Sequence, residues 1–126
     1  MTDVRRCGDC GNSPKNRFAE DLAVALLSGD RPGAEHGLSA DIRMEVAGGL
    51  CANGRADVLA SLVAADVLEI DTVVTHGRAG AVSGRVSRGG RTTPFAMVVR
   101  FASAKADAAR RIVFYCPDPD GLMPGP

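Results

Sequence analysis

Three consecutive segments of the chain alternate between apolar and polar residues, and this pattern limits the fold more than any other feature. They cover residues 68–75, 79–88 and 95–102. A period of two is typical of strands whose two faces have different surroundings, and strands joined by short turns pair antiparallel. The pattern predicts a meander that continues into a last strand at 112–116. Gly80 and Gly84 are typical of bulges, where a sheet bends.

The first half of the chain predicts two helices and one further strand. Ser13 is a good helix cap and Pro14 suits the first helical position, so a helix is expected over 14–28. Residues 41–46 alternate as a strand does, and residues 56–65 are rich in helix formers. This order predicts an α+β domain, in which the first helix covers the concave side of a curved, mostly antiparallel sheet.

The two ends of the chain differ in composition from its middle. Residues 1–12 are polar and rich in glycine, and we expect an N-terminal arm there. Residues 117–126 contain four prolines in ten positions, which predicts a disordered tail. Residues 13–116 then form one domain, because 126 residues suffice for a single core.

Charge and hydropathy exclude several classes of partner. Fifteen basic and fifteen acidic side chains cancel, so the composition predicts no binding to nucleic acid or to an anionic membrane. No apolar run approaches the roughly 20 residues of a membrane helix, and no apolar stretch of a secretory signal follows the first residues. We therefore expect a cytoplasmic protein whose four cysteines are reduced.

The order of elements resembles that of the nuclear transport factor 2-like (SnoaL-like) superfamily. Residues 10–16, which lead into the first helix, and residues 75–82 with Gly84, at the central hairpin, resemble an uncharacterised bacterial branch of it. The resemblance covers roughly residues 10–116. It implies a cone-shaped roll and a homodimer formed through the sheet. It does not imply one activity, because the superfamily contains isomerases, hydrolases, cyclases, dehydratases and non-catalytic association domains.

The chemistry best known on this fold is ketosteroid isomerisation, which uses an aspartate base and an oxyanion hole made of a tyrosine and a protonated aspartate. Alignment by hand places the tyrosine at Leu22, the base at Val46 and the neutral aspartate at Met97. All three residues are apolar, so that mechanism does not transfer to this chain.

Apolar residues of the first helix and of the strands are expected to face the inside of the cone. The candidate lining residues are Leu22, Ile42, Met44, Val46, Phe95, Met97, Val99 and Tyr115. Tyr115 belongs to this set only if Phe114 faces outward, which the sequence leaves open. Such a lining suits a small hydrophobic molecule, since methionine adapts its shape to a ligand. The alternative is a closed core in a non-catalytic homodimeric association module.

His76 and the pair Cys7 and Cys10 are the residues with chemistry of their own. His76 precedes a glycine at the expected hairpin, where it acts either as the acid or base of an isomerase or cyclase or as a turn residue. Cys7 and Cys10 have the spacing of two zinc ligands or of a redox dithiol, and the alternative is simple packing. Zinc is the one cofactor that the sequence suggests.

Charged residues that alternate with the apolar strand positions are expected on the solvated or subunit-facing side of the sheet. They are Asp41, Glu45, Glu69, Asp71, Arg43, Arg85 and Arg100. On one face of a sheet, opposite charges on neighbouring strands attract one another. We therefore expect these arginines to pair with these carboxylates.

Overall fold

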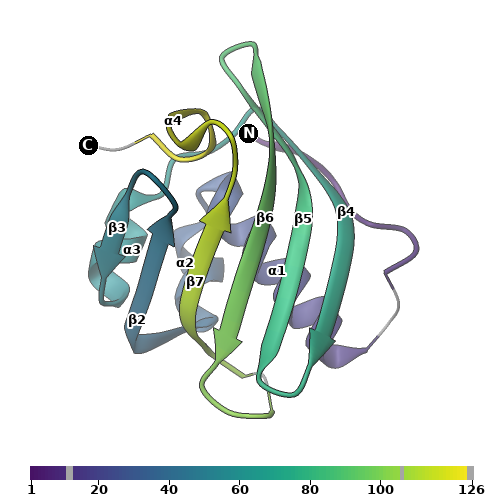
Figure 1. Ribbon diagram of the computed structural model, residues 1–126, viewed down its shortest axis with the longest axis vertical. Coiled ribbons are helices and arrows are strands. Elements are labelled where there is room, and N and C mark those ends of the chain that lie inside the picture. The colour runs from purple at the N-terminus through teal and green to yellow at the C-terminus, as the bar shows by residue number, and fades with distance from the viewer. Residues whose placement is uncertain (11–12, 106, 125–126) are drawn as a thin grey trace.

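The computed structural model describes residues 1–10, 13–105 and 107–124, and it shows helices packed on one side of a curved sheet (Figure 1). The helices are α1 (Pro14–Ser28), α2 (Arg31–His36), α3 (Arg55–Ser61) and α4 (Pro119–Leu122). The strands are β1 (Asp3–Arg5), β2 (Leu38–Val46), β3 (Cys51–Asn53), β4 (Val67–His76), β5 (Ala79–Arg88), β6 (Arg91–Phe101) and β7 (Ala109–Tyr115). No helix within the described residues is long and apolar enough to cross a membrane.

The sheet has the strand order β1-β4-β5-β6-β7-β2-β3. Strands β4 to β7 form the predicted antiparallel meander. Two neighbouring pairs are parallel, namely β1 with β4 and β2 with β7, so the sheet is mixed rather than purely antiparallel. Parallel neighbours need a long connection, and the rest of the domain supplies it in both cases.

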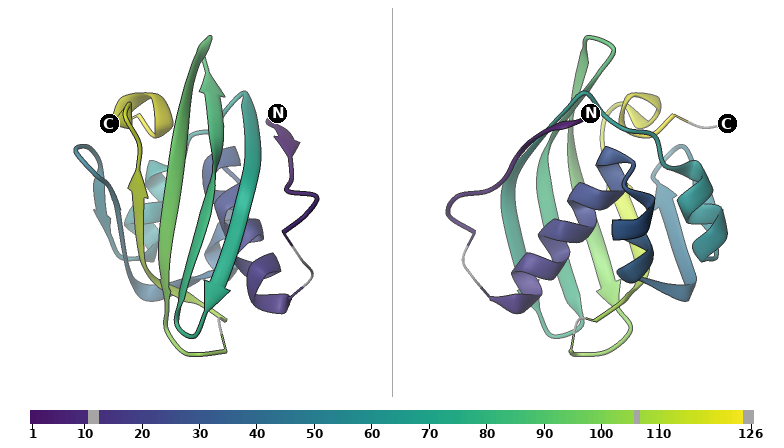
Figure 2. Two further views of the ribbon diagram at one scale, coloured as in Figure 1. Left: turned by 45° about the vertical axis from the view of Figure 1, so that its right-hand side comes forward. Right: turned by 180° about the vertical axis from the view of Figure 1, so that it is seen from behind.

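Helix α1 begins and ends where the sequence predicts. The Ser13 side chain accepts a hydrogen bond from the Asn16 backbone N–H, and Gly29 ends the helix in the left-handed conformation at φ 72°. The buried side of α1 contributes Leu22, Leu26 and other small or apolar residues to the core. Seen from behind, α1, α2 and α3 lie on the same face of the sheet (Figure 2).

The bulge expected at Gly84 lies on the neighbouring strand. Ile70 pairs with Gly84 and Thr72 with Ser83, so Asp71 is the extra residue of β4. A side chain at Gly84 would collide with the Glu69 carbonyl oxygen. Because a bulge bends its strand, this position contributes to the curvature of the sheet.

Both ends of the chain are more ordered than the sequence predicts. Within the N-terminal arm, residues 3–5 form β1 and pair with β4. The tail is not disordered over 117–124, because residues 119–122 form α4 and Leu122 is completely buried. The Arg88 guanidinium explains this order, since it donates hydrogen bonds to the carbonyl oxygens of Gly121 and Leu122. Burial lowers the pKa of Arg88, and the Asp66 carboxylate opposes that effect.

Candidate functional site

The residues predicted to line the cone come together as its packed centre. Seven of them are at most 4% exposed and belong to one hydrophobic cluster: Leu22, Ile42, Met44, Val46, Phe95, Met97 and Val99. The described depressions with volumes of 330–450 Å³ open at the surface, and Ile42, Phe95 and Val99 line none of them. These seven side chains therefore act first as the core that holds α1 on the sheet.

Tyr115 lies on the other side of the sheet, because Phe114 faces inward, so Tyr115 does not belong to the candidate lining. Ile112 and Phe114 are completely buried, whereas Tyr115 is 53% exposed. Successive side chains of a strand point to opposite faces, and the larger apolar pair of β7 takes the inner face. No tyrosine hydroxyl is therefore available to orient a molecule inside the cone.

The interior offers no group for acid–base chemistry. Among the described residues, Thr93 is the one buried side chain that is polar, and its hydroxyl donates to the Pro94 carbonyl oxygen. The three positions aligned with the ketosteroid isomerase residues, Leu22, Val46 and Met97, are all buried and apolar. General acid–base catalysis needs a titratable group within hydrogen-bond reach of the substrate, and the packed interior provides none.

His76 is an exposed residue at the end of β4, opposite Ala79 of β5. Its side chain has no hydrogen bond or ion pair to any residue in the described part of the chain. A catalytic role for His76 remains a prediction.

The outer face of the sheet is turned toward the viewer in Figure 1. Residues that stand opposite one another on neighbouring strands form rows across this face. One row consists of Arg43, Arg111 and Arg100 on β2, β7 and β6, and we call it the basic row. The next is the apolar row of Val113, Val98, Ala81 and Val74, running from β7 to β4. At the other end of the strands lies the paired row of Arg5, Glu69 and Arg85, on β1, β4 and β5. The outer face therefore presents three surfaces of different chemistry.

Both arginines of the paired row have carboxylate partners, as the sequence predicts for Arg85. The Arg85 guanidinium lies 3.1 Å from a Glu69 carboxylate oxygen and 3.5 Å from an Asp71 carboxylate oxygen. Arg5 approaches the other Glu69 oxygen at 3.7 Å. The bulge in β4 contributes to this arrangement, because Asp71 is its extra residue.

The basic row has no such balance. Arg43 stands directly opposite Arg111, and Arg111 directly opposite Arg100. Arg111 has a 3.6 Å contact with Glu45, and the Arg43 side chain donates to the neutral Asn53 amide oxygen. Arg100 forms no ion pair with any described residue, so the pairing predicted for Arg43 and Arg100 is not found. Like charges directly opposite one another destabilise a sheet.

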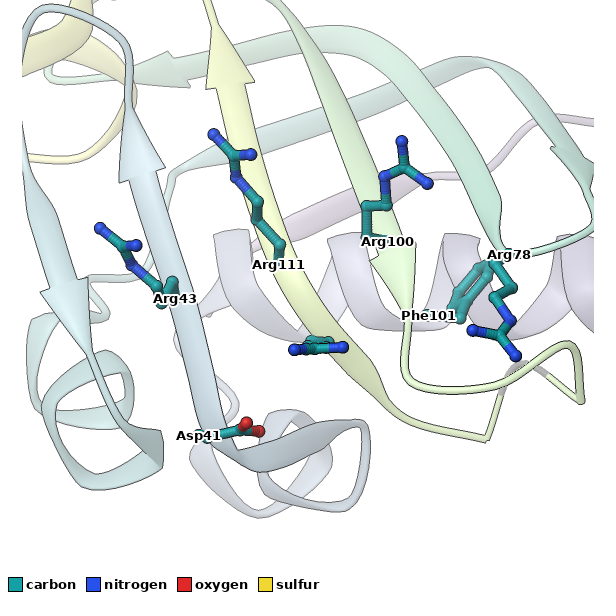
Figure 3. Close-up of a pocket in the computed structure, with 7 residues that line it drawn as sticks. Asp41, Arg43, Arg78, Arg100, Phe101 and Arg111 are labelled. Carbon is teal, nitrogen blue, oxygen red and sulfur yellow. The ribbon is translucent and has the colours of Figure 1, made fainter.

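Two further arginines reach the same place, and sequence patterns did not single them out. The pairing of β6 with β7 shifts between Arg100 and Phe101, which leaves Arg110 as an extra residue beside Arg111. Arg78 comes from the turn between β4 and β5. Together these arginines surround a depression of about 410 Å³ (Figure 3). Its lining residues are Asp41, Arg43, Arg78, Arg100, Phe101, Arg110 and Arg111.

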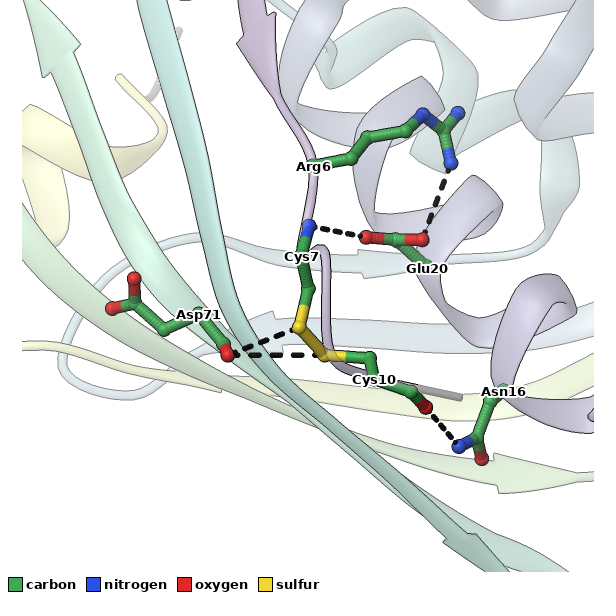
Figure 4. The surroundings of a disulfide bond; sticks show 6 residues. All are labelled: Arg6, Cys7, Cys10, Asn16, Glu20 and Asp71. Carbon is green, nitrogen blue, oxygen red and sulfur yellow. Dashed lines mark hydrogen bonds and ion pairs between the residues drawn. A yellow bond between two sulfur atoms is a disulfide. The ribbon is translucent and has the colours of Figure 1, made fainter. Parts of the chain in front are cut away.

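Cys7 and Cys10 form a disulfide within the arm, and hydrogen bonds around it attach the arm to the domain (Figure 4). The Cys7 backbone N–H donates to a Glu20 carboxylate oxygen at 3.0 Å, and the Asn16 side-chain amide donates to the Cys10 carbonyl oxygen at 2.8 Å. The Asp71 carbonyl oxygen lies 3.2 Å from the Cys7 sulfur. The arm is thus attached to both α1 and β4.

The disulfide bears on the zinc site and on the redox dithiol that the sequence suggests for this pair. Sulfur atoms joined to each other are not thiolates, so a zinc site belongs to the reduced protein alone and remains a prediction. The described residues contain no group of three or more potential metal-binding side chains. The expectation that all four cysteines are reduced is wrong for Cys7 and Cys10, whereas Cys51 and Cys116 are free thiols. Burial raises the pKa of Cys116 and the Asp118 carboxylate acts in the same direction, while a backbone hydrogen bond at Asp118 opposes them.

Comparison with solved structures identifies the architecture. A provisionally assigned ketosteroid isomerase of Kribbella flavida DSM 17836 superposes with a TM-score of 0.70, at 19% identity over 82% of this chain and 77% of that one. The chain has the nuclear transport factor 2-like fold. A nuclear transport factor 2-like protein of unknown function from Cytophaga hutchinsonii ATCC 33406 also gives a TM-score of 0.70, at 10% identity over 86% and 94% of the two chains.

Further members of this fold lead to the same assignment but not to a function. A provisionally assigned SnoaL-like polyketide cyclase of Shewanella denitrificans OS-217 gives a TM-score of 0.67, at 12% identity over 83% and 91% of the chains. No protein-family profile matches the sequence, and no curated protein does. The superpositions establish the nuclear transport factor 2-like fold, which confirms the predicted cone-shaped α+β roll. At identities this low they establish nothing finer.

Proposed function

We propose that this nuclear transport factor 2-like chain is a non-catalytic association module that pairs with a second copy of itself through the outer face of the sheet. The observation that carries the proposal is the packed interior, in which Met97 and Val46 occupy positions where the isomerase alignment requires carboxyl groups. An interior without a titratable side chain supports binding or assembly rather than turnover.

The apolar row supports this choice of surface. Val74 and Val98 are 56% and 41% exposed, and Tyr115 extends the same face at the end of β7. Exposed apolar side chains that adjoin across several strands are typical of interaction sites. A second copy is the partner proposed, since a small domain gains stability by covering one more apolar face and a two-fold axis pairs like surfaces.

The test is the mass of the protein in solution, measured by sedimentation or by light scattering after gel filtration. We expect twice the chain mass of 13.0 kDa for the unaltered protein and a shift to monomer for Val98→Lys. Val63→Lys is the matched control, because Val63 is similarly exposed but follows α3, away from the strands of the outer face. A monomeric unaltered protein would overturn the proposal, as would a Val98→Lys protein that remains a dimer.

A second candidate function is binding of a small hydrophobic molecule, and a groove beside α1 and α2 favours it. This groove has a volume of about 450 Å³, within the usual range of ligand pockets, and its apolar lining includes Phe18, Leu22 and Val24. Leu22 is the residue that this groove shares with the predicted interior set. Native mass spectrometry of the freshly purified protein tests the idea. An added organic mass that is absent from the Val24→Asp variant would support the idea. A native mass without any such addition would count against it.

A further inference from the structure

The protein's own residues compensate the basic row only in part, because Arg111 has a 3.6 Å contact with Glu45 and Arg100 has no ion pair with any described residue. Arg43, Arg111 and Arg100 occupy directly opposed positions on three adjacent strands. Neighbouring strands are about 4.8 Å apart, so three guanidinium groups share one small area. Opposed like charges reduce the stability of a sheet by up to about 1 kcal/mol for each pair. An anion from outside the chain would relieve this repulsion.

The other residues that line the depression add more positive charge than negative charge. Arg110, the extra residue of β7, and Arg78, from the β4–β5 turn, line the same depression (Figure 3). Asp41 is the one carboxylate in this lining, and it also accepts a hydrogen bond from the Ser39 hydroxyl. The whole chain has no net charge, so this concentration of arginines is a local property.

The arginine side chain indicates which anion fits. A guanidinium group presents a planar fork of donors that matches the oxygens of a phosphate, and paired forks bind it more strongly than single amines do. The depression, at about 410 Å³, has the size of a small-molecule site. Its one aromatic residue, Phe101, is only 3% exposed, so it offers no ring on which a nucleobase stacks.

We propose that the basic row, together with Arg78 and Arg110, binds an oligophosphate, a small anion that carries two or more linked phosphate groups. Arginines on successive strands contact successive phosphates, and the contacts are to phosphate oxygens alone. The site lies beside the apolar row on the outer face, since Arg100 and Arg111 are two residues from Val98 and Val113 on the same strands. It also differs from the cone interior, where the resemblance to known folds directs attention.

Isothermal titration in low salt and without magnesium tests the proposal with phosphate, pyrophosphate, tripolyphosphate and ATP as probes. We expect affinity to rise along the first three. ATP should bind within about twofold of tripolyphosphate if the phosphates alone are recognised, since stacking would otherwise add about 1–3 kcal/mol. Much tighter binding of ATP would identify a nucleotide as the source of the phosphates. Raising the sodium chloride concentration should weaken all four, because exposed charges are screened.

Matched variants decide where binding takes place. Replacing both Arg100 and Arg111 by Gln should weaken tripolyphosphate binding at least about tenfold, the loss expected when charge-assisted hydrogen bonds disappear. Arg85→Gln is the control, because Arg85 is exposed on the same face but pairs with Glu69 and Asp71. It should change the affinity less than about twofold, in line with the small net contribution of exposed pairs. Thermal unfolding checks that each variant is folded. The proposal is wrong if tripolyphosphate does not bind saturably, or if the double variant binds it as well as the unaltered protein does.

Discussion

The two faces of the sheet differ in how far their side chains are buried, and β6 illustrates the difference. Its inward residues, such as Met97, are completely buried against the rest of the core. Its outward residues, Val98 and Arg100, are exposed and belong to the apolar row and the basic row. The inner face is therefore covered by side chains of the same chain, whereas the outer face exposes side chains that a partner can contact.

This difference indicates where to search for function in a protein of this fold. Ketosteroid isomerisation, the chemistry best known on this fold, would place an acid and a base inside the cone. Here the inside consists of aliphatic, methionine and phenylalanine side chains that contact one another. The outer face instead exposes the apolar row, and it places Arg43, Arg111 and Arg100 opposite one another with Glu45 as the one carboxylate in an ion pair with them among the described residues.

The largest effect on stability should come from shortening a buried side chain of the inner face. Met97→Ala removes a fully buried side chain, and we expect a loss of about 2–5 kcal/mol in the free energy of unfolding, from lost burial and the cavity left behind. Val98→Ala, one residue away but on the outer face, should cost less than about 1 kcal/mol. Urea unfolding at one protein concentration measures both. Equal losses for the two variants would mean that the faces do not differ as described.

Most of the fold was predictable from local patterns. The bounds of α1 follow from Ser13 and Gly29, and the meander follows from alternation with glycine turns. The short elements were not predictable in this way. Helix α2 depends on the Asp30 side chain, which accepts a hydrogen bond from the Gly33 backbone, and α4 depends on carbonyl contacts with Arg88 across the fold. The contacts of Arg88 with α4 join residues that are distant in the sequence. The short helices themselves have too few residues to show a helical period.

The candidate sites were less predictable than the fold. Alternation correctly placed Arg43, Arg85 and Arg100 on the outer side of the sheet. It could not say which of them would find a carboxylate, because that depends on strand order and register. β2 lies next to β7 rather than next to β4, so Arg43 meets Arg111 instead of Glu69. The Arg110 bulge changes the period by one residue, which conceals the cluster in the sequence.

An intermediate effect should come from breaking the paired row. Glu69→Lys would leave Arg5 and Arg85 beside a third positive charge, and so would turn this row into a second basic row. We expect a loss of about 1–2 kcal/mol in low salt, the sum of lost attractions and new repulsions of up to about 1 kcal/mol each. Glu69→Gln should cost about half as much. Thermal or urea unfolding in low salt and in 1 M sodium chloride measures this, and a loss that salt does not reduce would contradict the electrostatic reason.

The smallest expected effect on stability is that of Arg100→Gln, and its sign tests whether the basic row is compensated within the chain. In low salt and without phosphate, Arg100→Gln should stabilise the protein by a few tenths of a kcal/mol, because it removes a like charge opposite Arg111. Arg85→Gln should destabilise it by a similar amount, since it removes an attraction to Glu69. Matched urea titrations in low salt and in 1 M sodium chloride resolve the two signs, and both effects should shrink at high salt. A loss of stability for both variants would mean that the basic row is already compensated within the chain, and the argument for an external anion would then fail.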